Sequence, residues 1–182
     1  MNDYDSGPLP QVRTRVDRDL PACVTALRAV HLADGYPTNW PQDPQKWLTG
    51  SADAAAWVAE WEGRIVGHVA LVRPGPEDIA PSLVGTGSTS VAVVSRLFVD
   101  PAARGRRVGA LLLERAIERA RALGARAVLD VVTTDTAAVA LYERLGWEFL
   151  ATGQQEWGPD ELVTVRCYAA PASGARSQKE TP

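Results

Sequence analysis

The sequence predicts an α/β (α+β) domain with a mixed, mostly antiparallel central sheet of about seven strands, flanked by four helices. Two apolar runs, 55–61 and 64–72, flank the pair Glu62-Gly63, which suits a tight turn between antiparallel strands. An amphipathic pattern over 111–123 ends at Gly124, and a continuous apolar strand follows at 127–132. The predicted order of elements is β-α-α-β-β-β-α-β-α-β-β.

The other elements follow from local periodicity and from breakers. Alternation predicts a first strand over 12–16, and aspartate caps followed by proline predict a helix from about Pro21 to about Ala33. Residues 73–90 hold several prolines and the breakers Gly75, Gly85 and Gly87, so we expect a long loop there. The remaining predictions are a short helix at 44–48, strands at 91–99, 147–151 and 162–169, and a helix that begins after Thr134 or Asp135 and is closed by Gly146.

Composition limits the possible classes of protein. With 182 residues and 46% hydrophobic residues, we expect one domain at 11–170 between disordered tails at 1–10 and 171–182. A net charge of -3 argues against general nucleic-acid binding. The two cysteines, Cys23 and Cys167, lie far apart with no Cys/His cluster, so we expect no metal site and no disulfide. No stretch of about 18 apolar residues and no basic leader occur, which predicts a cytoplasmic protein that is not bound to a membrane.

The most informative segment is the apolar strand 91–99 with the basic, glycine-bearing loop 104–110 after it. A helix follows this loop at once, so free backbone amides and the positive end of a helix dipole meet there. This pattern predicts a site for a phosphate or pyrophosphate. The loop lacks the GxxxxGK[ST] pattern of a P-loop and the GxGxxG pattern of a dinucleotide fingerprint.

Two motifs carry a family resemblance. The run Arg104-Gly105-Arg106-Arg107-Val108-Gly109-Ala110 resembles the pyrophosphate-binding motif of the GCN5-related N-acetyltransferase (GNAT) superfamily, and 135–147 resembles its later helix motif. The resemblance implies acetyl-CoA as donor, an amine as acceptor, and Tyr142 as the acid that protonates the departing thiolate. It implies that these residues contact the cofactor: Leu97, Phe98, Val99, Arg104, Gly105, Arg106, Arg107, Val108, Gly109, Ala110, Asp135 and Tyr142.

Two positions depart from the family pattern. Arg107 stands where the family most often has glycine, and Asp135 stands where it often has asparagine. Asp135 is therefore either a contact for the cofactor arm or an ordinary helix N-cap.

The base that deprotonates the amine has several candidates. Asp130 lies within the apolar run 127–132, where a carboxylate is costly unless it is paired or functional. In ribosomal-protein-type family members a glutamate at the matching place acts as base, so the resemblance implies that role for Asp130. The alternatives are that Asp130 is a buried partner for an arginine or a backbone amide, and that the base is His68 or water.

The acceptor site carries no comparable motif. Asp34, Tyr36 and Trp40, with Asp43 and Trp47, lie in the irregular segment that helps form the acceptor groove in the family. Aromatic rings beside carboxylates suit a cationic amine, although proline-flanked tryptophans also cover core edges. Ser95 and Arg96 on the cofactor strand, and Trp157 near the final hairpin, are further candidates.

The predicted function is transfer of acetyl from acetyl-CoA, by direct attack, to a primary amine of a small molecule or a protein N-terminus. Main-chain donors near Leu97 and Phe98 would stabilise the oxyanion. The alternative is a non-catalytic acyl-CoA-binding or sensing module. A nucleic-acid role for 104–107 is disfavoured by the acidic balance, and an exposed final strand would allow a homodimer.

Overall fold

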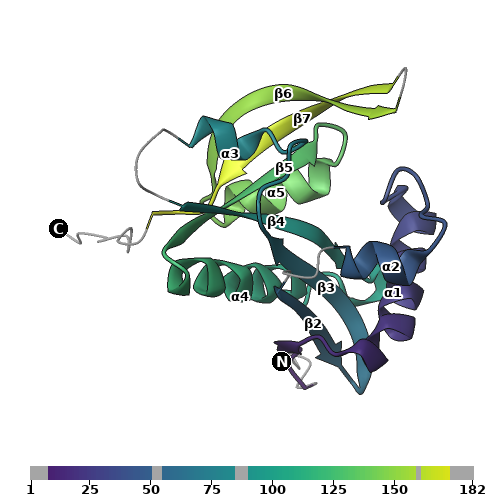
Figure 1. Ribbon diagram of the computed structural model, residues 1–182. Coiled ribbons are helices and arrows are strands. Elements are labelled where there is room, and N and C mark those ends of the chain that lie inside the picture. The colour runs from purple at the N-terminus through teal and green to yellow at the C-terminus, as the bar shows by residue number, and fades with distance from the viewer. Residues whose placement is uncertain (1–7, 51–54, 85–89, 159–160, 173–182) are drawn as a thin grey trace, which may run out of the picture.

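The computed structural model describes residues 8–50, 55–84, 90–158 and 161–172, and these form an α+β domain (Figure 1). The predictions of fold class and of a mostly antiparallel seven-stranded sheet are confirmed. The elements are β1 (Gln11–Thr14), η1 (Asp17–Asp19), α1 (Leu20–Asp34), α2 (Pro44–Thr49), β2 (Ala55–Trp61), β3 (Arg64–Val72), α3 (Ala80–Leu83), β4 (Ser90–Val99), η2 (Pro101–Ala103), α4 (Val108–Ala122), β5 (Ala125–Val132), α5 (Thr136–Arg144), β6 (Glu148–Gly158) and β7 (Glu161–Ala169).

The sheet has the order β1-β2-β3-β4-β5-β7-β6. Strands β4 and β5 run parallel, and the other neighbouring pairs are antiparallel. The helix α4 connects the two parallel strands, as a parallel pair requires. Gly124 and Gly146 end the helices before β5 and β6 in the left-handed conformation, with φ of 68° and 75°.

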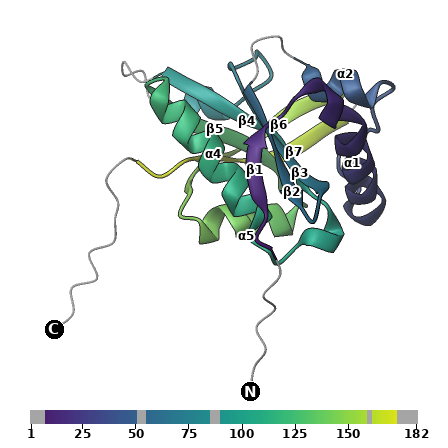
Figure 2. The ribbon, with the colours of Figure 1, turned by 90° about the horizontal axis from the view of Figure 1, so that it is seen from below.

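Helices cover both faces of the sheet. Side chains of α4 and α5 share one core cluster with alternate residues of the central strands, among them Leu112, Leu129 and Tyr142. A second cluster joins α1 and α2 to Val58 and Phe98, and a third joins α3 to Val93 and Val128. Figure 2 shows α4 on one side of the sheet and α1 and α2 on the other.

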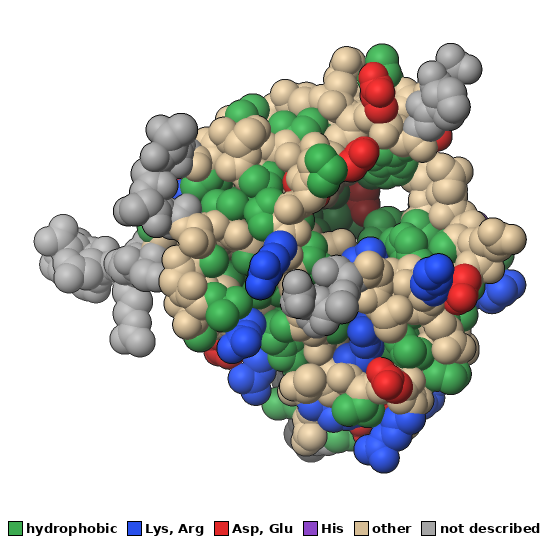
Figure 3. Space-filling model, in the orientation of Figure 1, with side chains coloured by type: hydrophobic (Ala, Val, Ile, Leu, Met, Phe, Trp, Pro, Cys, Tyr) green, Lys and Arg blue, Asp and Glu red, His purple; other side chains and the backbone are tan. Residues whose placement is uncertain are grey.

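The parallel strands β4 and β5 separate along their length. Their pairing covers residues 90–93 of β4 and 125–128 of β5 and stops there, although both strands continue. The sheet therefore opens between residues 94–99 and 129–132. Figure 3 shows the surface hollowed between the β6–β7 hairpin and the α1–α2 segment.

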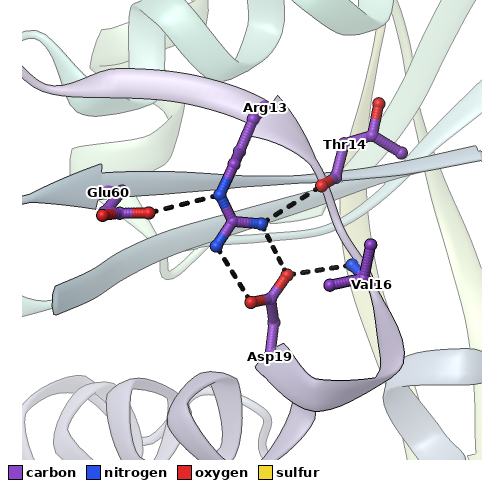
Figure 4. A network of polar contacts seen from close by, with 5 residues as sticks. All are labelled: Arg13, Thr14, Val16, Asp19 and Glu60. Carbon is purple, nitrogen blue, oxygen red and sulfur yellow. Dashed lines mark hydrogen bonds and ion pairs between the residues drawn. The ribbon is translucent and has the colours of Figure 1, made fainter. Parts of the chain in front are cut away.

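A buried carboxylate anchors the start of α1 to the edge of the sheet (Figure 4). The Arg13 guanidinium on β1 donates to both oxygens of Asp19, at 2.7 and 2.9 Å, and to Glu60 on β2 at 3.2 Å. The backbone amide of Val16 also donates to Asp19. The hydrogen bonds from Arg13 hold the pKa of Asp19 below its usual value. This carboxylate therefore stays ionised and keeps the start of α1 attached to β1.

The structure corrects four expectations. Residues 73–90 contain α3 as a fifth helix, while Gly85 and Gly87 lie outside the described residues. Helix α4 begins at Val108 rather than at 111. The final strand β7 pairs on both sides, so β1 and β6 are the edges instead.

The fourth correction concerns the tails. Pro10 is buried, and the Trp61 indole donates to the carbonyl of Pro8 at 2.9 Å, so residues 8–10 pack on the domain. At the other end, Arg121 donates to the carbonyl of Pro171 at 3.3 Å. Residues 1–7 and 173–182 of the predicted tails lie outside the described residues. Within the described ranges, no helix is long and apolar enough to cross a membrane.

Candidate active site

A β-bulge interrupts β4 beside the opening in the sheet. Ser95 pairs with Ala70 and Phe98 pairs with His68, so two residues of β4 lie opposite one of β3. One of the two, Arg96, has φ of 51°, which is uncommon for a residue other than glycine. The bulge turns the backbone at Arg96 and Leu97 away from the regular ladder, where β4 has no β5 neighbour on its other side.

His68 holds this bulge in place. Its ring is fully buried and stacks on Phe98, with 5.3 Å between ring centroids. Nδ1 lies 2.9 Å from the carbonyl oxygen of Arg96, and the Arg15 guanidinium lies 3.0 Å from Nε2. The consistent tautomer donates from Nδ1 and accepts at Nε2. Burial lowers the pKa of His68 to about 4, so the ring is neutral and both nitrogens are engaged. The structure supports a positioning role for His68 rather than that of the base.

The N-terminus of α4 provides free backbone donors. The first helical hydrogen bond runs from the amide of Leu111 to the carbonyl of Arg107, at 3.0 Å. Three helical amides precede it, those of Val108, Gly109 and Ala110, and they have no acceptor among the residues described. The loop before them contains two left-handed residues, Gly105 with φ of 78° and Arg107 with φ of 63°. Such turns aim successive amides at one point and favour an anion.

The two departures from the family pattern find local explanations. Arg107 occupies a left-handed position, which is where glycine carries no steric penalty, so the family preference follows from backbone geometry. The carboxylate of Asp135 accepts the amide of Ala138 at 3.0 Å and caps α5. A contact between Asp135 and the cofactor arm remains a prediction.

Tyr142 lies on α5 with its ring in the core. Its side chain packs against Trp147 and Tyr168, with ring centroids 5.6 and 5.9 Å away, and the residue is 6% exposed. Burial, followed by the charges of Tyr36 and Asp135, raises the pKa of Tyr142. Within the described part of the chain the hydroxyl has no hydrogen-bond partner. Tyr142 is therefore a neutral phenol at neutral pH, with its proton available for donation.

Two predicted acceptor residues, Tyr36 and Trp47, lie together in this region. Tyr36 follows α1 and contacts Trp47 of α2 edge to face, with ring centroids 6.3 Å apart. Burial raises the pKa of Tyr36, and the charge of Asp135 raises it further. The charges of Tyr36 and Asp135 both contribute to the raised pKa of Tyr142, so the α1–α2 segment and α5 interact electrostatically.

Other predicted acceptor residues have partners elsewhere. Trp40 packs against His31 at 5.1 Å between ring centroids, and Arg28 lies over its outer face. Asp34 forms an ion pair with Arg104 of the anion loop, and Asp43 caps α2 by accepting the amide of Lys46. Tyr36 therefore packs with α2, whereas Asp34 links the end of α1 to the predicted cofactor loop.

The carboxylate of Asp130 is surrounded by hydrogen-bond donors. Its carboxylate accepts the amide of Ile79 at 2.7 Å, the amide of Ala80 at 3.0 Å and the side-chain amide of Gln155 at 2.8 Å. These donors belong to α3 and β6, and they occupy both carboxylate oxygens. These contacts support the alternative left open by the sequence, a buried partner for backbone amides, while the role of Asp130 as base stays a prediction.

An Asp130→Asn variant should separate the two roles. The new amide nitrogen would face a donor, so we expect the free energy of unfolding to fall by about 2 kcal/mol as at least one hydrogen bond to α3 or β6 is lost. At a temperature where the variant remains folded, its kcat should stay within a few-fold of the wild type. Urea unfolding and steady-state kinetics on the same preparation measure both quantities. A large loss of kcat at unchanged stability would restore Asp130 as the base.

Three features of the site escaped the sequence analysis. The bulge at Arg96 has no local signal, because neither glycine nor proline marks it. Gln155, which joins Trp157 on the hairpin to Asp130, lies between the strands predicted at 147–151 and 162–169 and carried no signal. Gly67 carried a readable signal: a Cβ there would lie 3.0 Å from Leu112 and 3.1 Å from the carbonyl oxygen of Phe98. No group of His, Cys, Asp and Glu that could hold a metal ion occurs among the residues described.

The fold and this site define a class of protein. A mixed sheet whose two parallel strands separate, together with free amides at the N-terminus of the helix that joins them, suits a ligand that carries a phosphate group. The acetyltransferase (GNAT) family model matches residues 22–147. The chain belongs to this family, and the predicted resemblance is confirmed. The prediction that it is an enzyme of the transferase class is confirmed at the level of the family.

Two relatives illustrate the similarity. An uncharacterized N-acetyltransferase of Escherichia coli K12 is 32% identical over 150 residues, which is 78% of this chain and 83% of that protein. An uncharacterized N-acetyltransferase of Methanocaldococcus jannaschii is 34% identical over 111 residues, 60% of this chain. The match spans 46% of the length of the Methanocaldococcus protein.

Solved structures share the fold at lower identity. The ribosomal-protein-S18-alanine N-acetyltransferase of Escherichia coli aligns with a TM-score of 0.65 at 18% identity, over 96% of this chain and 100% of that one. An acetyltransferase of Salmonella typhimurium, solved with acetyl-CoA, aligns with a TM-score of 0.64 at 18% identity and the same coverage. At these identities the likeness establishes the fold.

Proposed function

We propose that this protein transfers the acetyl group of acetyl-CoA to a primary amine of a small molecule or a protein N-terminus, by direct attack of the amine. One observation carries the proposal: the free N-terminus of α4 packs close against α5 at Leu141, the residue before the neutral phenol of Tyr142. The first suits the pyrophosphate of the donor, and the second suits protonation of its leaving thiolate.

The residues present fit the cofactor. The amides of Val108, Gly109 and Ala110 have no acceptor among the residues described, and two left-handed residues precede them. A Cβ on Gly109 would lie 3.0 Å from Leu141 of α5, so the helix N-terminus sits close against that neighbour. These groups, with Arg104, would hold the pyrophosphate, and the backbone of β4 at Leu97, Phe98 and Val99 would hold the pantetheine arm.

Residues of this chain can assist two steps of the transfer, stabilisation of the oxyanion and protonation of the leaving thiolate. When bound, acetyl-CoA supplies an acetyl group activated as a thioester. The backbone at the bulge, near Leu97 and Phe98, would donate a hydrogen bond to the oxygen on which charge develops. The phenol oxygen of Tyr142 would give its proton to the sulfur that leaves. Because Asp130 and His68 are fully engaged, water is the base that this environment supports best.

The proposed compartment is the cytosol. Cys23 and Cys167 are both free and buried, in keeping with a reducing environment.

An Arg107→Asp variant tests the donor site. It places a carboxylate at the N-terminus of α4, where it would repel the pyrophosphate, while aspartate tolerates the left-handed backbone better than most residues. In calorimetric titration with acetyl-CoA, we expect the Kd of the variant to rise roughly tenfold or more over the wild type. Arg107→Gly is the matched control, because it removes the same charge without adding a carboxylate.

Arg107→Gly should change the Kd only a few-fold, since the backbone amides supply most of the site. If wild-type protein that is folded shows no heat of binding with acetyl-CoA, the proposed function fails. Where binding is found, an amine library with detection of released CoA thiol then identifies the acceptor.

A further inference from the structure

The guanidinium of Arg96 lies beneath the α1–α2 segment. It extends from the β4 bulge to cover the Trp47 ring, with 5.1 Å from Cζ to the ring centroid. It also fills the space beside Gly50, where a Cβ would lie 3.0 Å from Cζ. The Nε atom is buried and has no hydrogen-bond partner in the described structure. Arg96 is therefore a cation largely withdrawn from water, held by an aromatic ring and by packing.

The charge of Arg96 is not balanced by an ion pair within the part of the chain that the structure describes. Three carboxylates of the candidate site have other partners: Asp34 pairs with Arg104, Asp43 caps α2 and Asp135 caps α5. Burial and the nearby charge of Arg15 both lower the pKa of Arg96, so its surroundings disfavour the positive charge.

The position of Arg96 relates it to the reaction. Tyr36 and Arg96 interact electrostatically, and Tyr36 in turn interacts with Tyr142. The carbonyl of Arg96 is held by His68, so the backbone that carries this cation is the bulge beside the opening. The Trp47 ring contacts both Arg96, at 5.1 Å from Cζ, and Tyr36, at 6.3 Å between ring centroids, so the cation lies in the segment predicted for the acceptor.

We infer that Arg96 binds an anionic group of the acceptor, so that the substrate is an amine that also carries a carboxylate or phosphonate, such as an amino acid. This inference rests on the proposed function and narrows its substrate class. An anion would neutralise a desolvated cation that has no ion pair among the described residues, and it would form hydrogen bonds with the guanidinium, whose Nε has no partner there. Trp47 and Gly50 keep the guanidinium in one place, so the anion sets the position of the amine.

The test compares pairs of amines in which one member, called the charged member, carries an anionic group and the other, called the uncharged member, does not. L-methionine and L-phenylalanine are each measured against the corresponding amide, and 2-aminoethylphosphonate is measured against ethanolamine. For the wild type we expect kcat/KM to be higher for the charged member of at least one pair. Arg96→Asn should lower that ratio by roughly tenfold to a hundredfold, mainly through KM, as expected for a lost charge-assisted hydrogen bond.

Asparagine is the chosen replacement because it accepts a positive φ better than most side chains, so the bulge should persist. Arg96→Lys keeps the charge but loses the planar group, and it should restore part of the preference. Arg115→Gln, on the exposed face of α4, removes one positive charge far from the site and should leave the ratio unchanged.

The inference is overturned if the wild type acetylates only the uncharged members or none of the panel, or if Arg96→Asn lowers kcat/KM equally for both members of a pair. Calorimetric titration with acetyl-CoA distinguishes this failure from failure of the proposed function. Binding of acetyl-CoA without a charge preference overturns the role of Arg96 alone, whereas absence of binding overturns both.

Discussion

A Tyr142→Phe variant will lose roughly a hundredfold or more of kcat, which is the contribution expected of a positioned proton donor. The substitution removes one oxygen and leaves the ring that packs against Trp147 and Tyr168. Because the hydroxyl has no hydrogen-bond partner within the described residues, the free energy of unfolding should change little. Turnover of acetyl-CoA with a responsive amine, measured by release of CoA thiol, gives kcat.

Two further measurements make this prediction specific. The Kd for acetyl-CoA should stay within a few-fold of the wild type, since the proposed pyrophosphate donors lie on α4 rather than on Tyr142. Tyr168→Phe is the control, because it removes a phenol of the same aromatic cluster whose hydroxyl donates to Glu143. Unchanged turnover in Tyr142→Phe would exclude the phenol as the acid.

Most elements of this fold could be predicted from local sequence patterns. The hairpin around Glu62-Gly63 appears at the predicted residues, and Gly124 and Gly146 end their helices in left-handed conformations. These features depend on backbone preferences of a few adjacent residues, which a single sequence displays directly. The short helix α3 escaped prediction because its stability comes from Asp130, about 50 residues away along the chain.

The residues of the candidate site also fall into two groups, those that a contiguous motif predicts and those whose role depends on distant contacts. The anion loop and Tyr142 belong to contiguous motifs, so their positions could be predicted from residues 104–110 and 135–147 alone. The role of Asp130 could not, because the sequence shows a carboxylate in an apolar strand but not the amides that surround it. Arg96 is the opposite case: its significance is that no described carboxylate pairs with it, which appears only when the α1–α2 segment folds over β4.

His68, which holds the bulge of β4, makes the stability of the folded protein depend on pH. His68 stays neutral in the folded protein, since burial and the charges of Arg15 and Arg96 lower its pKa to about 4, despite the opposing hydrogen bond to the Arg96 carbonyl. In the unfolded chain a histidine titrates near pH 6.5. As the pH falls below about 6.5, the unfolded chain therefore takes up a proton that the folded protein does not bind until about pH 4.

We expect the free energy of unfolding to decrease as the pH falls through this window, by about 3 kcal/mol in total. Above about pH 6.5 the contribution of His68 is constant, and below about pH 4 the loss is complete. Urea unfolding at several pH values between 7 and 4.5 measures the slope for the wild type and for His68→Gln. The variant cannot bind a proton at this site, so its slope should be clearly smaller, although its stability at pH 7 is lower. Parallel slopes for the two proteins would mean that His68 is not the buried neutral ring that holds the bulge, and the geometry assigned to the backbone donors near Leu97 would lose its support.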